Sequence, residues 1–409
     1  MYPILKGLRV VECASFIAAP SCALHLQQLG AEVIRIDAMG GGMDFGRWPV
    51  TGQGHSLYWE GLNKGKRSVA IDLSRPEGRQ LAVDIITAPG ADAGVFVTNY
   101  PQKSIFGHTA LSQLRPDLIT VRVLGWRDGG PAVDYTVNAA LGLPAMTGSS
   151  ENGNNPVNHV LPAWDLLTGA YAAFATLAAE RHRSRTGQGQ EITIPLSDVA
   201  LTAMGNLGQI AEVLTGNDGD RPKYGNALYG AFGRDFVTSD GQRVMLVAIT
   251  RRQWTGLLEA LELQGKIQAL ESALSVRFST DEGLRFVHRD VLFPLFEQAV
   301  GALDFSTLRS KLDANGVLWS PYQTLRAAVK GDPRFSLETP LFSLLEHPSG
   351  LSYPAPGAAA TFHAGQRQDA VRAPRLGEHT EQVLSDVLSL SSANIGRLYD
   401  AGLIASSRL

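Results

Sequence analysis

The chain has 409 residues, a formal net charge of −3 and a hydrophobic fraction of 44%. This length allows about two or three domains, and the composition is that of an ordinary globular enzyme. The small net charge gives no reason to expect a nucleic acid or an anionic membrane surface as a partner. The two cysteines, Cys13 and Cys22, lie near each other in an apolar region. They predict buried free thiols and a reducing, cytoplasmic location.

Apolar runs separated by turns predict an α/β fold from the N-terminus onward. Leu8 to Cys13 is a predicted strand, Pro20 to Leu29 a helix, and Glu32 to Ile36 a second strand. This order predicts a right-handed βαβ unit. Charged residues inside the first apolar run argue against a signal peptide or a membrane span. The turn between strand and helix lacks a Gly-x-Gly-x-x-Gly pattern, so it is either an ordinary βα turn or a helix N-terminus that binds an anion.

The same pattern continues along the first half of the chain. Further strands are predicted at Ser68 to Ile71, Ala91 to Val97, Ile119 to Val123 and Glu191 to Pro195. Ser74 is a predicted cap of the helix that has Pro76 in its first turn. The glycine-rich segment 40–54 is predicted to be a mobile or ligand-covering loop, and residues 197–214 have helical spacing.

A second domain is predicted in the middle of the chain. Asn217 to Pro222 has the composition of a linker. We therefore expect a large domain over residues 1–220, a small domain over 221–326, and a return to the large domain over 327–409. The small domain should begin with the strand pair Asp235 to Thr238 and Arg243 to Ile249 and continue mostly as helix. Residues 346–362 read as irregular with short strand signals, and residues 375–407 as helical.

Asp165 stands at the start of a nearly apolar helix that is rich in glycine and alanine and that should end at Gly187. A carboxylate in this position can cap the helix by accepting bonds from the backbone N–H groups of the first turn. It can also be the nucleophile of covalent catalysis. The local sequence leaves both interpretations open. The nine histidines are scattered, and no spacing of His, Cys or carboxylates predicts a metal site.

Several segments together carry a resemblance to a known family. They are Leu5 to Glu12, Leu29 to Asp37, Asn63 to Leu73, Asp165 to Gln190, Tyr224 to Asn226, and Ala373 to Thr380. In this order and spacing, the chain resembles the family III CoA-transferases, the formyl-CoA transferase group, over nearly its full length. The resemblance implies an α/β fold: a large domain with a Rossmann-like, mostly parallel sheet built from both chain ends, and a smaller α+β middle domain. It also implies an intertwined homodimer, which a monomer in gel filtration would contradict.

For the active site, the resemblance implies that Asp165 is the nucleophile and carries CoA as an aspartyl thioester. CoA would enter as a thioester substrate with a carboxylic acid as its partner, and no cofactor would be bound permanently. The implied CoA contacts are Ile17, Ala18, Lys64, Lys66, Arg67, Ile71, Asn99, Tyr100 and Lys103. Lysine and arginine suit the phosphates of CoA, although a solvated charge run is the alternative for residues 64–67. The ring of Tyr100 could stack on adenine.

Arg47, Trp126 and Arg127 are candidate substrate contacts, with a plain surface role as the alternative for either arginine. Val133 stands where the related α-methylacyl-CoA racemases have a histidine, and valine cannot exchange a proton. The chain also has Thr98 where the family usually has a glutamate. It has only Gly230 and Gly233 where several relatives carry a four-glycine lid.

The expected reaction is the intramolecular transfer of CoA between the C1 and C4 carboxyl groups of mesaconyl-CoA. The first alternative is intermolecular transfer from succinyl-CoA or another dicarboxylyl-CoA to a carboxylic acid. The second alternative is racemisation, which Val133 disfavours. The third is a non-catalytic CoA-binding protein, in which replacement of Asp165 would have no effect.

Overall fold

The structure is a computed structural model that describes residues 1–216 and 219–407. The chain divides into two compact units. Unit 1 contains Met1–Leu141, His159–Asn217 and Pro333–Leu409, and unit 2 contains Gly142–Asn158 and Asp218–Asp332. Residues 142–158, which the sequence boundaries place in the large domain, thus belong to unit 2, and unit 1 resumes at residue 333. The predicted linker begins with two residues that lie outside the described ranges.

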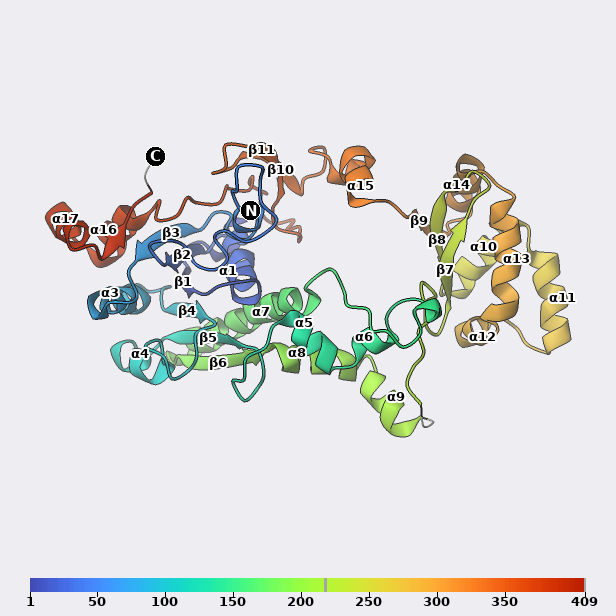
Figure 1. Ribbon diagram of the computed structural model, residues 1–409, viewed down its shortest axis with the longest axis horizontal. Helices are drawn as coiled ribbons and strands as arrows, with labels where there is room; N and C mark the ends of the chain where they lie inside the picture. The colour runs from blue at the N-terminus through green and yellow to red at the C-terminus, as the bar shows by residue number, and fades with distance from the viewer. Residues whose placement is uncertain (217–218, 408–409) are drawn as a thin grey trace. The chain divides into compact units, whose positions relative to one another are not determined.

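Unit 1 is built on a seven-stranded sheet with the order β12-β3-β2-β1-β4-β5-β6 (Figure 1). The strands are β1 (Arg9–Cys13), β2 (Glu32–Asp37), β3 (Arg67–Ile71), β4 (Val95–Thr98), β5 (Ile119–Leu124), β6 (Gln190–Pro195) and β12 (Ile404–Ala405). All neighbouring pairs are parallel except β12, which runs antiparallel to β3. The predicted α/β class and the mostly parallel sheet are confirmed, and the C-terminal end of the chain supplies an edge strand.

The central strands are apolar because both faces of the sheet are covered. Val10 on β1 pairs with Val33 on β2 and with Val95 on β4, and all three are buried. One apolar cluster includes residues of α1 and α7, and another includes residues of α3 and α16. These two clusters form the core of unit 1.

The remaining elements of unit 1 are mostly helices. They are η1 (Pro3–Leu5), α1 (Ala18–Gln28), α2 (Leu57–Leu62), α3 (Pro76–Thr87), α4 (His108–Leu114), α5 (Asp134–Ala140), α7 (Ala163–Thr186), α8 (Leu196–Asn206), α9 (Gln209–Thr215), η3 (Pro333–Phe335), α16 (Thr380–Leu388) and α17 (Ser392–Asp400). A hairpin of β10 (Phe342–Glu346) and β11 (Ser352–Pro356) accounts for the strand signals near residue 346.

Some local predictions are confirmed and others are wrong. Gly187 ends α7 in the left-handed conformation, with φ +71°, as predicted. Ser74 does not cap α3, because its Oγ donates to Asp72 Oδ1 at 2.6 Å and Arg75 occupies the cap position. The helical segment 197–214 is two helices, because Gly208, with φ +76°, ends the first one.

Unit 2 combines a three-stranded antiparallel sheet, β7-β8-β9, with helices. Its elements are α6 (Leu143–Met146), η2 (Ser150–Asn152), β7 (Phe232–Val237), β8 (Arg243–Ala248), α10 (Arg251–Leu261), α11 (Gln264–Leu274), α12 (Glu282–Val287), α13 (Arg289–Gly301), α14 (Phe305–Ala314), β9 (Leu318–Pro321) and α15 (Leu325–Gly331). Aromatic rings fill its core, where the Phe232 and Phe296 centroids lie 4.4 Å apart. In the described part of the chain no single helix has the length and apolarity to cross a membrane, although the pair α13 and α14, bent by 116°, passes that test jointly.

Candidate functional site

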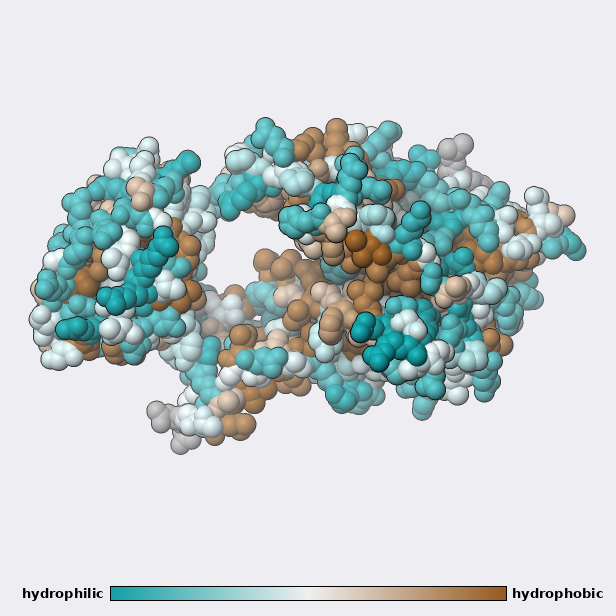
Figure 2. Space-filling model, turned by 180° about the vertical axis from the view of Figure 1, so that it is seen from behind, coloured by the Kyte–Doolittle hydropathy of each residue, from teal (hydrophilic) through white to brown (hydrophobic). Residues whose placement is uncertain are grey.

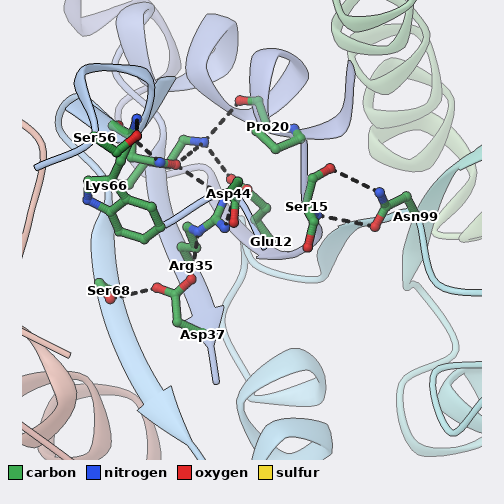
Figure 3. Close-up of polar contacts among 12 residues, drawn as sticks. Glu12, Ser15, Pro20, Arg35, Asp37, Asp44, Ser56, Lys66, Ser68 and Asn99 are labelled. Carbon is green, nitrogen blue, oxygen red and sulfur yellow. Dashed lines mark hydrogen bonds and ion pairs between the residues drawn. The ribbon is translucent and has the colours of Figure 1, made fainter. Parts of the chain in front are cut away.

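The order in which the chain adds strands to the unit 1 sheet reverses between β1 and β4. β2 and β3 lie on one side of β1, and β4 lies on the other. In open α/β sheets, ligands bind beyond the carboxyl ends of the strands at such a switch point. Here the turn that follows β1 meets the residue that follows β4. Asn99 Nδ2 donates to the Ser15 carbonyl at 3.0 Å, and the Ser15 N–H donates to Asn99 Oδ1 at 3.3 Å (Figure 3). Asn99 therefore fixes the shape of the β1–α1 turn.

That turn presents the N-terminus of α1. Phe16 has φ +69°, a left-handed conformation that is uncommon for a residue other than glycine. Strained conformations of this kind concentrate at functional sites. Ile17 and Ala18 follow it and are nearly buried. The first N–H groups of a helix have no partners within the helix, so this turn can accept an anionic or polarised oxygen.

Helix α7 lies against α1 and brings Asp165 to this turn. A Cβ atom on Gly169 would lie 2.6 Å from Ser21 Cβ and 2.8 Å from the Ala18 carbonyl oxygen. Only glycine allows so close an approach of the two helices. Asp165 precedes Gly169 by one helical turn, so its position is beside the first turn of α1. Pro162 occupies the N-cap of α7, and the interpretation of Asp165 as the cap is therefore wrong.

The carboxylate that caps α7 comes instead from α5. Asp134 Oδ2 accepts the backbone N–H groups of Trp164, at 2.7 Å, and of Asp165, at 3.1 Å. Its other oxygen lies 2.5 Å from Nε2 of His159. Asp134 is 1% exposed, so it is a buried anchor for the first turn of α7, Asp165 included.

These neighbours change the acidity of Asp165. Burial and the negative charge of Asp134 raise the pKa of its carboxyl, the Arg47 guanidinium opposes the rise, and the net pKa is about 7. Arg47 also lies over the rings of Phe16, at 5.3 Å, and Tyr58, at 5.5 Å. The structure thus brings together four of the predicted site residues: Ile17, Ala18, Arg47 and Asp165, with Asn99 supporting the turn between them.

A buried ionic network lies beside this turn (Figure 3). Arg35 on β2 binds Glu12 and Asp37, both at 2.7 Å, and its Nη2 binds Asp44 Oδ2 at 2.8 Å. Lys66 Nζ lies 2.7 Å from the second oxygen of Glu12. Asp44 belongs to the glycine-rich segment 40–54 that also carries Arg47. The network therefore anchors this segment to the sheet, where the sequence alone suggested mobility.

The two lysines of the basic cluster at residues 64–67 are buried, in contrast to the prediction. Lys66 is 2% exposed, and besides Glu12 it donates to the Pro20 carbonyl and to Asn63, both at 3.0 Å. Lys64 is also buried and donates to the Gly61 carbonyl at 2.5 Å. Arg67 pairs with Glu32 and Asp386. The two lysines are enclosed and engaged within the protein, which corrects their predicted role as phosphate contacts. Arg67, whose side chain is 18% exposed, stays a candidate for that role.

The other predicted CoA contacts occupy different environments. Ile71 is fully buried in an apolar cluster and pairs with β12, so its side chain is a core residue and not a ligand contact. Tyr100 follows Asn99, is partly exposed, and has its ring edge-on to Phe106 at 5.3 Å. Lys103 is exposed in the loop that follows. Tyr100 and Lys103 thus remain available to a ligand.

The loop after β5 holds the last two predicted contacts. Trp126 packs against the apolar cluster of α1 and α7. Arg127 is 82% exposed in its side chain and forms an ion pair with Asp198 on α8. The geometry of Arg127 matches the surface role that the sequence analysis left open.

Sequence reasoning missed Asp134, His159 and Tyr58 as members of the site. Asp134 and His159 are separated from each other by residues 142–158, which belong to unit 2. No local sequence pattern indicates that the chain passes through unit 2 and then brings His159 back to Asp134.

Within the described residues, no group of three or more His, Cys, Asp or Glu side chains is arranged to hold a metal ion.

Comparisons with known proteins agree with this geometry. Residues 5–380 match the sequence model of CoA-transferase family III. The chain is 50% identical, over 99% of its length and 98% of the relative, to a 2-methylfumaryl-CoA isomerase of Chloroflexus aurantiacus. It is 27% identical, over 98% of its length and 90% of the relative, to the human succinyl-CoA:glutarate CoA-transferase.

A solved structure has the same fold. The crystal structure of a CAIB/BAIF family protein from Brucella suis matches with a TM-score of 0.74 and 25% identity, covering 95% of this chain and all of that one. The family match spans both units and includes the residues at the switch point of the sheet. The protein therefore belongs to CoA-transferase family III and is an enzyme that acts on CoA thioesters.

Proposed function

We propose that the enzyme moves CoA between the two carboxyl groups of 2-methylfumaric acid, which is mesaconic acid. The observation that carries this proposal is the 50% identity to a 2-methylfumaryl-CoA isomerase over nearly the whole of both chains. An isomerase of such a thioester can exchange the esterified and the free carboxyl group without any other acid. The proposed substrate is thus the C1 thioester and the proposed product the C4 thioester.

In the first half of the proposed reaction, Asp165 attacks the thioester carbonyl carbon. A C–O bond forms, the C–S bond breaks, and CoA leaves as a thiolate, so that a mixed anhydride joins Asp165 to the acid. The thiolate then attacks the aspartyl carbonyl, which releases the dicarboxylate and leaves CoA as a thioester on Asp165. The N-terminus of α1 can stabilise the oxyanion that develops in these steps.

In the second half, the other carboxylate of the retained acid attacks the aspartyl thioester. CoA thiolate leaves again, and its attack on the acid's carbonyl in the new anhydride restores Asp165 and gives the isomeric thioester. Covalent catalysis divides one difficult exchange into activated steps. Because the acid and CoA stay in the site, neither has to be recaptured from solution.

This mechanism predicts a rise of activity with pH. Asp165 attacks only when it is ionised, and its pKa of about 7 means that it is protonated below neutral pH. We expect kcat/KM to fall as the pH decreases through about 7. Asp134→Asn removes a neighbouring negative charge, lowers the pKa of Asp165, and should shift this limb of the profile to lower pH.

A pH–rate profile of kcat/KM for both proteins checks this. Asp84→Asn, at an exposed position on α3, is the matched control and should leave the profile unchanged. If kcat/KM falls at the same pH in the wild type and in Asp134→Asn, the charge of Asp134 does not act on the reacting group.

We also propose that the enzyme is a homodimer. Helix α7 exposes Leu167, Tyr171 and Phe174 at helical spacing, and the α8–α9 segment exposes Leu207, Val213 and Leu214. Figure 2 shows apolar residues gathered over α8 and α9 in the lower part of the view. Clusters of exposed apolar side chains of this kind mark protein interfaces, which supports the assembly that the family resemblance implies.

The reaction is tested with the C1 thioester of mesaconic acid and an excess of ¹³C-labelled free mesaconic acid. Liquid chromatography with mass detection then separates the CoA esters. We expect conversion to an isomer that contains no label. A labelled product would show that the acid exchanges with solution and would overturn intramolecular transfer.

The relatives named as succinyl-CoA transferases, at 26–28% identity, favour one second candidate. In that case the C1 thioester would stay unchanged, and CoA would pass from succinyl-CoA to an added dicarboxylic acid. A panel of such acids with succinyl-CoA as donor distinguishes the two activities.

A further inference from the structure

A second cluster of titratable side chains lies in unit 1 outside the site of Asp165. A pocket of about 290 Å³, partly open to solvent, is lined by α2, the turn after it, and the residues around β11. Glu60, Lys64, His347 and Tyr353 line it together with apolar and proline residues. The proposed mechanism uses none of these side chains, and Lys64, Glu60 and His347 are each 5% exposed or less.

Lys64 is unusual because it is a buried amine without a counter-ion. Its Nζ donates to the Gly61 carbonyl at 2.5 Å, and no ion pair joins it to a carboxylate in the described parts of the chain. Lys66 is the contrast two residues later, since its Nζ lies 2.7 Å from Glu12. A buried charge is costly unless it is paired. Burial and, to a smaller extent, the charge of Lys66 together lower the pKa of Lys64 to about 8.

His347 supplies a base in the same cavity. Its ring stacks on Tyr353 with centroids 3.7 Å apart. Neither ring nitrogen has a hydrogen-bond partner of normal geometry, and Nδ1 lies 3.9 Å from Glu60 Oε2. Burial lowers the pKa of the imidazole, while Glu60 opposes the shift. The imidazole is therefore neutral near pH 7 and can accept a proton.

Glu60 holds this arrangement in place. Its Oε1 accepts the backbone N–H of Ser349 at 2.8 Å, and its Oε2 accepts the Tyr353 hydroxyl at 2.5 Å. The carboxylate is thus fixed near His347, where it favours the imidazole that has taken up a proton. Carboxylate, imidazole and amine then line one small cavity whose other walls are largely apolar.

We propose that Lys64 is a nucleophilic lysine that accepts an acyl group from an acyl-CoA thioester entering this cavity. The amine attacks the thioester carbonyl carbon, a C–N bond forms, and the C–S bond breaks. His347 takes the proton from the amine and passes it to the departing thiolate, so that the products are an amide on Lys64 and free CoA thiol. This modification goes beyond the proposed isomerase reaction and does not depend on Asp165.

The test is the acetylation rate of each lysine in the full-length protein with acetyl-CoA at about pH 8, followed by peptide mass mapping. At that pH the neutral fraction of an amine with a pKa of about 8 is about a hundredfold that of an ordinary lysine. Lower basicity reduces nucleophilicity, so we expect Lys64 to react about tenfold faster than the exposed Lys103. Lys66, which is buried but paired, is the matched control and should react least.

Two further measurements make the result decisive. The rate at Lys64 should level off above about pH 8, because its amine is then mostly neutral. His347→Phe should slow Lys64 alone and leave Lys103 unchanged, and a Lys66 that stays unreactive shows that the variant is folded, because Lys66 is buried. Acetylation of Lys64 no faster than that of Lys66 would overturn the proposal. Reaction with acetic anhydride but not with acetyl-CoA would overturn the thioester as donor.

Discussion

Asp165→Asn is expected to reduce turnover of the CoA thioester by at least about a thousandfold, because an amide cannot form the anhydride or the aspartyl thioester. Asparagine has nearly the same size, and the hydrogen bond between residue 165 and Asp134 uses the backbone N–H of residue 165, which Asp134 Oδ2 accepts at 3.1 Å. Folding should therefore be preserved. Steady-state rates measure the first effect. Intact-protein mass spectrometry after a rapid quench should show a covalent CoA adduct on the wild type and none on the variant.

Asp290→Asn is the control for this experiment. Asp290 also lies in the first turn of a helix, α13 of unit 2, and its side chain is 85% exposed. It should keep full activity and the adduct. Normal turnover by Asp165→Asn, or an adduct that persists in it, would show that another residue carries CoA and would end the proposed mechanism.

The sheet could be predicted from the sequence because its strands are short apolar runs bounded by turn residues. Each run, such as Ile119 to Val123, contains enough information to identify a buried strand. The edge strand β12 could not be found this way, since Ile404 and Ala405 are only two residues. Their pairing with β3 depends on a contact with residues 70 and 71, which no local pattern shows.

The site was predictable only in part, for a similar reason. Asp165 was found through its motif, but its acidity depends on Asp134 and Arg47, which reach it from distant segments. The prediction is wrong for the lysines at 64 and 66 because the sequence does not reveal which group a charged side chain contacts. Lys66 looks like a phosphate ligand until the fold places Glu12 2.7 Å from it. Short-range sequence patterns specify elements well, and they leave the long-range pairing of charges undetermined.

Arg35→Met is expected to cause the largest loss of stability, about 3–5 kcal/mol in the free energy of unfolding of unit 1. Glu12 on β1 is the register partner of Arg35 on β2, and Asp37 lies two residues further on the same face. Burial opposes the charge of Arg35, but Asp37, Glu12 and Asp44 outweigh it and raise its pKa. Without the guanidinium, Glu12 keeps Lys66, but the buried carboxylates of Asp37 and Asp44 lose the cation that they contact.

The matched control is Arg9→Met. Arg9 on β1 pairs with Glu32 on β2 at 3.1 Å, but its side chain is 23% exposed, so the loss should stay below about 1 kcal/mol. Native-state hydrogen exchange of the β1 to β3 amides, at equal protein concentration, compares the two variants without assuming that both units unfold together.

The loss of Arg35 also releases Asp44, and with it the segment that holds Arg47 near Asp165. Arg35→Met should therefore lower kcat/KM as well as stability. Equal protection of these amides in both variants would mean that the buried network does not hold this edge of the sheet together.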